Sequence, residues 1–300
     1  ELSRFRNHEA QAIGMYTARR QKHRRGHHPC NRHFEVYGTA LLDLEQLMLR
    51  LKDILAWHDG PATRIVNIGS NDGISEDPLT TLLQLLPNAW AVAVERDPEL
   101  CMQHRDNLPH VNVWCGTATP LSAWEAFDEW LPQTDPQLQQ TGLLNVAVLK
   151  IDIDSYDCNL LETYLSGFRS MRMGYVLQLH PMVIITEVND GIPPPVQQAL
   201  LFDPRLLNTS FEHPGCGGNI PVAGCSLSYQ VSLLTQYGYS LLMYNSGNAV
   251  FVHKDVVPTL ARFGLQSPVD EFECYWHALV SAQCVSGRQV RRWFYEPDGP

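Results

Sequence analysis

Two groups of residues in this 300-residue chain have the types and spacing needed to hold a nucleotide-containing cofactor. The first is the stretch 67–73, where Gly69 and Gly73 permit a tight turn and close approach of the backbone to a ligand. The second is Glu95, 22 residues after Gly73 at the end of an apolar run, whose carboxylate can accept two hydrogen bonds from a ribose diol. An ordinary strand-to-helix turn and a surface glutamate are the alternative interpretations. The expected cofactor contacts are Asn67, Gly69, Ser70, Asn71, Gly73, Glu95 and Asp152.

A third group follows the apolar run that ends near residue 153 and could act on a substrate. Asp152 and Asp154 stand at the carboxyl end of a predicted buried strand, where acidic groups are costly unless they bind something. Ligands of open α/β sheets bind at that edge. Asp154 could instead cap the following helix, and Tyr156 could be a packing residue. We expect Asp152, Asp154 and Tyr156 to form the catalytic group.

The same edge is a candidate magnesium site. Glu187, Asn189 and Asp190 follow the next predicted strand, whose end neighbours that of Asp152 and Asp154 in a doubly wound sheet. Oxygen ligands of this kind suit Mg²⁺, which can orient an acceptor hydroxyl and lower its pKa. We therefore predict Asp152, Asp154, Glu187 and Asn189 as metal ligands. The alternative is that these acids contact the cofactor directly.

Two further features could serve the acceptor side. His180 could act as a general base, but its place before a predicted strand favours a structural histidine. The Pro- and Gly-rich stretch 191–224 is predicted to be a lid over the acceptor, shaped in part by His213, Cys216 and Cys225. The pair Cys216 and Cys225 could also form a disulfide or bind a metal.

Strand and helix patterns alternate along the chain, which predicts a doubly wound, mostly parallel α/β sheet. The predicted polar loop is 132–142, and Asn245–Asn248 is predicted to turn a terminal antiparallel hairpin. The predicted strands are 65–68, 89–95, 111–115, 146–153, 183–188, 239–244 and 249–253. The predicted helices are 37–55, 78–86, 98–108, 121–131, 159–171, 226–237 and 269–285.

These motifs together resemble the S-adenosylmethionine (SAM)-dependent methyltransferases, most closely the FkbM-like branch. The turn is similar to that branch's Asp-x-Gly-Ala-Asn-x-Gly, matched at Gly69, Asn71 and Gly73. The stretch 95–98 is similar to Glu-Pro-Asp-Pro, and 150–157 to Lys-Ile-Asp-Val-Glu-Gly-Tyr-Glu. The resemblance covers about residues 60–255 and implies a seven-stranded sheet, SAM as cofactor and methyl transfer, commonly to oxygen. The turn departs from the pattern at Asn67, which lacks the charge to pair with the cofactor's ammonium, and at Ser70.

Two functions remain open from the sequence. The chain is either an active methyltransferase with a small-molecule or protein acceptor, or a catalytically inactive methyltransferase-like scaffold subunit of a larger assembly. Glu95 and the Asp152-x-Asp154 pair favour the enzyme, whereas Asn67 and the Pro-rich stretch favour the scaffold. A nicotinamide-dependent oxidoreductase is less favoured because the turn lacks G-x-G-x-x-G.

Charge and composition divide the chain further. The net charge is −10, but residues 1–34 hold eight basic and two acidic residues, so this arm carries +6 and the rest −16. The acidic body argues against nucleic acid, while the arm could dock on an acidic protein or an anionic membrane surface, or be a remnant of organelle targeting. We expect a helix within 35–60 packed on the core, a methyltransferase-like domain over 61–255 and a helical extension over 256–300.

The eight scattered cysteines predict core thiols of a reducing compartment. No transmembrane segment is predicted. The chain is therefore expected to be intracellular, either soluble or peripheral, and an organelle remains open.

Overall fold

The computed structural model describes residues 44–275 except 59, 61–62, 76, 129, 132–135, 170–173, 175, 209–223 and 246. The basic arm 1–34, most of the 256–300 extension, and His213 and Cys216 of the expected lid lie outside the described residues.

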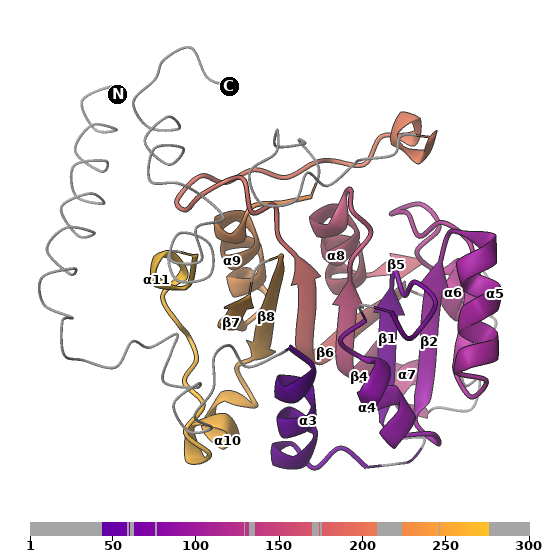
Figure 1. The fold of residues 1–300 in the computed structure, drawn as a ribbon, viewed down its shortest axis with the longest axis horizontal. Helices are drawn as coiled ribbons and strands as arrows, with labels where there is room; N and C mark the ends of the chain where they lie inside the picture. Colours follow the sequence, from indigo (N-terminus) through magenta and orange to yellow (C-terminus); the bar gives the residue numbers. More distant parts are fainter. Residues whose placement is uncertain are drawn as a thin grey trace, which may run out of the picture.

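The centre of the molecule is a sheet with strand order β3-β2-β1-β4-β6-β8-β7 (Figure 1). Strands β3, β2, β1, β4 and β6 pair in parallel, and β8 runs antiparallel to both of its neighbours. A two-residue strand, β5, adds antiparallel to the beginning of β6. The strands are β1 Arg64–Ile68, β2 Trp90–Glu95, β3 Asn112–Cys115, β4 Leu143–Ile151, β5 Phe168–Arg169, β6 Val176–Glu187, β7 Tyr239–Asn245 and β8 Asn248–His253.

Helices cover both faces of this sheet. Alternate residues of each strand point to opposite faces, so one face carries Ile65, Val148 and Val183 and the other carries Val66 and Leu149. The first face packs on α3 Leu44–Ile54, α4 Thr80–Leu85, α5 Pro98–Asn107 and α10 Val257–Arg262. The second packs on α6 Glu125–Asp128, α7 Pro136–Thr141, α8 Asp157–Ser166, α9 Leu227–Gln236 and α11 Glu271–Tyr275.

The central strands are apolar because helices cover them on both faces. β4 is buried along almost its whole length, with Val148 at 0% and Leu149 at 0% exposure although they face opposite sides. A parallel strand covered on both faces must be apolar at successive positions. Lys150 is the one polar side chain among the buried positions of β4, and its surroundings belong to the site described below.

The predicted fold class is confirmed: a doubly wound, mostly parallel sheet closed by an antiparallel hairpin. Three local predictions are wrong. The expected polar loop 132–142 contains α7. The helix expected over 159–171 begins at Asp157 and ends at Ser166, because Gly167 leaves the helix at φ 106° and β5 follows. The helix expected over 121–131 is regular only over α6, with turns on either side. The loop misprediction arose because α7 is polar except for the buried Leu138.

The expectation of free core thiols is also wrong. Cys101 pairs with Cys115 and Cys158 with Cys225, and Cys274 is disulfide-bonded as well. Among the described residues no cysteine is free. The suggested pairing of Cys216 with Cys225 is therefore wrong. Because disulfides persist in oxidising compartments, they argue against the reducing compartment expected from the sequence.

No helix within the described part of the chain is long and apolar enough to cross a membrane.

Candidate functional site

A cavity of about 600 Å³ lies where the strands β1, β2 and β4 end. Its walls come from the turn after β1, the end of β2, the loop after β3 and the segment that follows β4. Leu207, far along the chain, and Asn248 at the start of β8 complete it. The cavity thus stands at the carboxyl edge of the parallel strands, where open α/β sheets bind ligands.

The turn after β1 depends on its glycines. Gly69 has φ 75°, and a β-carbon on it would lie 1.7 Å from the carbonyl oxygen of Asp152. Gly73 has φ 78°, and a β-carbon there would lie 2.7 Å from the His104 ring. Asn71 also takes a left-handed conformation, at φ 52°. Gly69 therefore allows the ends of β1 and β4 to approach, while Gly73 makes room for a helix side chain behind the turn.

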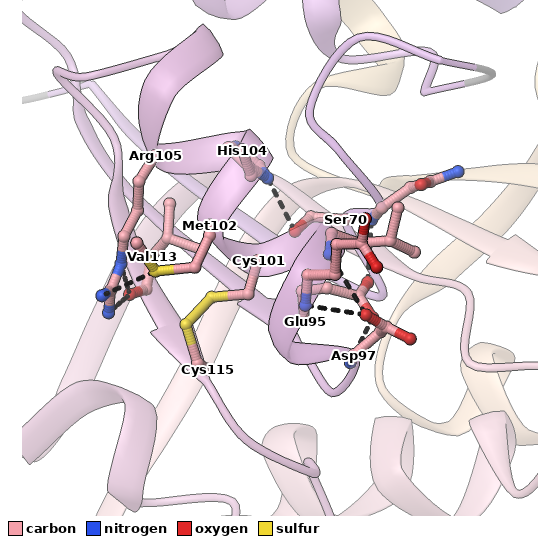
Figure 2. Close-up of a disulfide and its surroundings, with 12 residues drawn as sticks. Ser70, Glu95, Asp97, Cys101, Met102, His104, Arg105, Val113 and Cys115 are labelled. Carbon is pink, nitrogen blue, oxygen red and sulfur yellow. Dashed lines mark hydrogen bonds between the residues drawn. A yellow bond between two sulfur atoms is a disulfide. The ribbon is translucent and has the colours of Figure 1, made fainter.

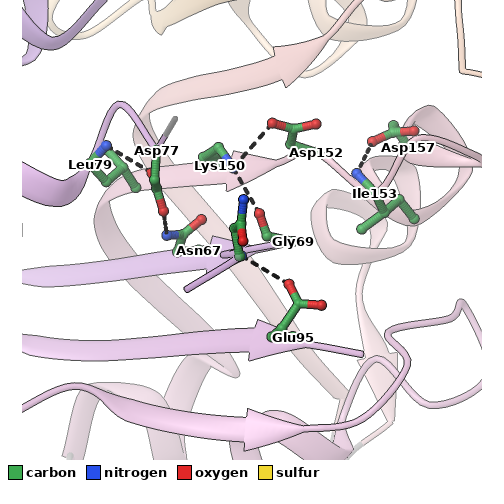
Figure 3. A network of polar contacts seen from close by, with 10 residues as sticks. Asn67, Gly69, Asp77, Leu79, Glu95, Lys150, Asp152, Ile153 and Asp157 are labelled. Atoms are coloured by element: carbon green, nitrogen blue, oxygen red, sulfur yellow. Dashed lines mark hydrogen bonds and ion pairs between the residues drawn. The ribbon is translucent and has the colours of Figure 1, made fainter. Parts of the chain in front are cut away.

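Glu95 is fixed by this turn. Its two carboxylate oxygens accept backbone N–H groups of Asn71 and Asp97, each at 2.9 Å (Figures 2 and 3). The residue is only 8% exposed, yet it lines the cavity. Each carboxylate oxygen has two lone pairs, so one on each remains for a ligand. The carboxylate is thus held in one orientation beside the cavity.

Two of the expected cofactor contacts lie behind the turn. The Ser70 side chain is fully buried and its hydroxyl is 2.9 Å from Nδ1 of His104 (Figure 2). Burial lowers the pKa of His104, and the carboxylate of Asp77 opposes that shift. Asn67 is 1% exposed. Neither Ser70 nor Asn67 is among the described residues that line the cavity.

Asp77 does line the cavity and was missed as a site residue. Its Oδ2 accepts a 2.5 Å hydrogen bond from Nδ2 of Asn67, and its Oδ1 accepts the backbone N–H of Leu79 at 2.9 Å (Figure 3). An aspartate before Pro78 is expected to cap a helix, but α4 begins at Thr80 with Leu79 at its N-cap position, and the bond from Leu79 closes a turn ahead of the helix. Its proximity to Asn67 depends on the turn between them and has no sequence signal.

Lys150 is a second missed residue. It is 2% exposed, and its ammonium donates to the carbonyl of Gly69 at 2.9 Å and pairs with Asp152 at 3.2 Å (Figure 3). Burial lowers the pKa of Lys150, but the carboxylates of Asp152, Asp77 and Glu187 outweigh it and hold that pKa above its ordinary value. The ammonium is therefore charged and ties β1 to β4 at the cavity edge.

The structure brings three of the four expected metal ligands together. One carboxylate oxygen from each of Asp152, Asp154 and Glu187 lies within 4.8 Å of the others. The fourth, Asn189, accepts the N–H of Gly191 through its side-chain oxygen at 3.1 Å. Asp152 and Asp154 line the cavity, whereas Glu187 and Asn189 do not. Asp190 accepts hydrogen bonds from the Tyr244 hydroxyl and from a backbone N–H of the hairpin.

The segment after β4 is held by Asp157. This fully buried carboxylate accepts the N–H groups of Ile153 at 2.8 Å and Ser155 at 3.0 Å, so it, rather than Asp154, orders the entry to α8. Burial raises the pKa of Asp157 to about 6. Asp154 has φ 56° and is exposed at the cavity.

Tyr156 is a wall of the cavity. Its hydroxyl donates to the carbonyl of Ala118 at 2.8 Å, and its ring meets that of Phe202 edge-on at 4.9 Å. Burial raises the pKa of Tyr156 to about 12. A phenol with these properties is neutral at pH 7 and already donating, so it is suited to shaping the cavity rather than to removing a proton.

His180 does not reach the cavity. It lies in the first half of β6, opposite Asn145 of β4, and its Nδ1 is 3.2 Å from the Asn145 side-chain oxygen. Its ring packs edge-on against His253. The structural interpretation of this histidine is therefore the better one.

The described part of the expected lid meets this edge of the sheet. Phe202 contacts Tyr156, and Leu207 lines the cavity. The carboxyl end of this stretch is linked to α8 by the Cys158–Cys225 disulfide. The backbone N–H of Gly224 also donates a hydrogen bond to the carbonyl of Ser155.

The strand order, with β8 antiparallel to both of its neighbours, and the glycine turn facing an acid at the end of β2 are those of a Rossmann-like α/β fold. Solved structures with a similar fold include a TehB-like SAM-dependent methyltransferase from Corynebacterium glutamicum, 14% identical, covering 81% of this chain and 100% of that one at a TM-score of 0.34. Another is the SAM-bound amino pentose methyltransferase CalS10 from Micromonospora echinaspora, 11% identical, covering 80% and 97% at a TM-score of 0.36.

No protein-family model matches the sequence, and no curated protein is similar enough to be matched. At identities and TM-scores this low, the similar structures say nothing about what this chain binds. Its function is therefore inferred from its own residues.

Proposed function

We propose that this chain binds SAM in the cavity and transfers its methyl group, in the manner of the FkbM-like branch, to an oxygen of a small-molecule or protein acceptor. The observation that carries the proposal is the carboxylate of Glu95, fixed by Asn71 and Asp97 N–H groups with a lone pair left on each oxygen. A ribose diol offers the two donors that such a carboxylate accepts.

The surroundings of Glu95 fit the rest of the cofactor. Gly69 and Asn71 give the ligand access to the backbone of the turn, and Gly116 and Ala118 line the cavity after the neighbouring strand. SAM supplies an electrophilic methyl group on a positively charged sulfur, and the carboxylates around the cavity favour a cationic ligand. The chain's contribution is to bind and orient, since neither Tyr156 nor His180 is placed to remove a proton.

The acceptor side is proposed to use Asp152, Asp154 and Glu187, with Mg²⁺ as a candidate ligand. Three carboxylate oxygens within 4.8 Å suit that cation, and it would favour ionisation of an acceptor hydroxyl. The nearby Lys150 ammonium opposes the cation, so this part of the proposal needs its own test. Mg²⁺ alone should raise the melting temperature of the wild type but not of Asp154→Asn, which changes an exposed side chain. No shift in either protein would remove Mg²⁺ from the proposal.

Isothermal calorimetry with SAM and S-adenosylhomocysteine tests the main proposal. Glu95→Ala should weaken binding by about 1.5–3 kcal/mol, the worth of charge-assisted hydrogen bonds. Glu95→Gln keeps one acceptor oxygen and should weaken it less. The exposed Glu99 on α5 provides the matched control, and Glu99→Ala should bind like the wild type.

Absence of binding at millimolar cofactor would overturn the enzyme proposal in favour of the inactive scaffold subunit. Binding of NADH in place of SAM would favour an oxidoreductase.

The basic arm is proposed to dock on an acidic protein or an anionic membrane surface. Deleting 1–34 should then abolish a salt-sensitive association without lowering the melting temperature. The disulfides favour an oxidising compartment, so an organelle of the secretory route fits better than the cytosol.

A further inference from the structure

Position 67, at the end of β1, carries an amide where the family pattern has an acid. The Asn67 side chain does not line the cavity, and its amide nitrogen donates a 2.5 Å hydrogen bond to Asp77 (Figure 3). Asp77 does line the cavity. A negative charge is therefore present beside this strand end, but it comes from a residue ten positions later.

The two residues are complementary. Asp77 is only 8% exposed, and its two oxygens are anchored by Asn67 and by the backbone of Leu79, which leaves one lone pair on each. A carboxylate at position 67 would face Asp77 at hydrogen-bond distance, where two ionised acids repel each other strongly. An amide at 67 instead donates a hydrogen bond to Asp77 and puts no like charge beside it.

The Lys150 ammonium does not neutralise all of the negative charge of the carboxylates around it. Asn67 and Lys150 are partners in the pairing of β1 with β4, so both stand on the same face of the sheet as Asp77. The Lys150 ammonium donates to Gly69 and pairs with Asp152 at 3.2 Å. Asp77, Asp152 and Glu187 all act on this one ammonium, so the carboxylates around it outnumber the cation. A second cationic group in the cavity is therefore favoured, and an anionic phosphate is disfavoured.

We infer that Asp77 is the residue that accepts the amino-acid ammonium of SAM, and that the charge for this contact has moved from position 67 to position 77. The inference rests on the proposed function and names the residue that binds the methionine part. Asn67 acts through Asp77 as a positioning residue. The ribose contact of Glu95 is separate, because Glu95 is held by Asn71 and Asp97 instead.

Two ligands separate a contact with the ammonium from a structural role. S-adenosylhomocysteine carries the amino-acid portion, whereas 5′-methylthioadenosine has the same nucleoside and thioether without it. In Asp77→Asn, calorimetry should show S-adenosylhomocysteine binding about 10- to 100-fold weaker, the range of a charge-assisted hydrogen bond. The affinity for 5′-methylthioadenosine should change less than about twofold, with displacement by S-adenosylhomocysteine measured where direct heats are small.

An exchange of the two side chains tests the pairing itself. The double variant Asn67→Asp with Asp77→Asn keeps one acid and one amide and should recover part of the affinity that Asp77→Asn loses. Asp106→Asn is the control, since Asp106 lies exposed on α5 and does not line the cavity; it should leave both affinities unchanged.

Equal losses for both ligands in Asp77→Asn, or no loss for either, would overturn the inference while leaving SAM binding intact. A wild type that binds neither ligand would overturn the proposed function and this inference with it. The melting temperature of each unliganded variant shows whether a loss of affinity merely reports a loss of folding.

Discussion

The two sides of the cavity are built in different ways. On the side proposed to bind the cofactor, called the cofactor side, the turn after β1, Glu95 and Asp77 are tied to one another by hydrogen bonds across at most 24 positions of the chain. On the side proposed to bind the acceptor, called the acceptor side, Asp152, Asp154 and Glu187 come together from two strand ends, and the segment after β4 is linked by a disulfide between residues 67 positions apart. The first side is built from residues that are close in the sequence and needs only the pairing of β1 with β2. The second exists only once the whole sheet has formed.

The largest effect is expected from Gly69→Ala, where the two sides touch. A β-carbon at Gly69 would lie 1.7 Å from the Asp152 carbonyl, and backbone on backbone cannot move aside as a flexible side chain can. We expect destabilisation of about 4 kcal/mol or more, measured by urea unfolding, with loss of cofactor binding. Gly264 has the same φ of 75° with nothing within 4 Å, so Gly264→Ala measures the conformational cost alone. That control should cost about 1–2 kcal/mol. Equal losses in the two variants would show that the close approach of β1 and β4 is not what requires glycine.

Each of the two disulfides should stabilise one of the two sides of the cavity. Cys101–Cys115 joins α5 to the end of β3, next to the cavity residues Leu100 and Gly116 (Figure 2). Cys158–Cys225 closes 67 positions against 14 for the first, so loop entropy predicts losses of about 4 and about 3 kcal/mol on replacement by serine pairs.

Ligand binding and hydrogen exchange then sharpen the contrast. Serine at 101 and 115 should weaken S-adenosylhomocysteine, because that disulfide braces the cofactor side. Serine at 158 and 225 should leave the affinity nearly unchanged but speed amide exchange in 191–208, which packs through Phe202 on Tyr156. The reverse pattern would contradict the division of the cavity into two sides.

Much of the cofactor side could be predicted from the sequence, because strand patterns and glycine turns are short-range signals. Gly69, Asn71 and Glu95 line the cavity as the spacing indicated. Asp77 could not be recognised, since an aspartate before proline is equally a helix cap. Lys150 was quoted in a motif, but its contacts with Gly69 and Asp152 follow from the register of β1 against β4.

The disulfides were mispredicted for a related reason. Which cysteines meet depends on how α8 and the segment before α9 pack, and neither the spacing of the cysteines nor their neighbours in sequence carries that information. The helix over 159–171 was extended too far because the apolar residues Phe168 and Met171 continue its three- and four-residue spacing past Gly167, where the backbone turns.

The smallest effect we predict is a pH dependence that belongs to the acceptor side alone. Burial raises the pKa of Asp157 to about 6, against an ordinary value of 3.8. Because the folded protein holds this proton more tightly than the unfolded chain, the carboxyl's contribution to stability is full below about pH 4 and declines as pH rises to about 6. The loss approaches about 2–3 kcal/mol, after which stability no longer depends on this group.

Asp157→Asn keeps an acceptor for Ile153 or Ser155 N–H and does not titrate. Its unfolding free energy relative to wild type should therefore rise between pH 4 and 6. A constant difference between Asp157→Asn and wild type across that range would mean that the carboxylate is ionised when the protein folds, and that its two backbone hydrogen bonds offset its burial.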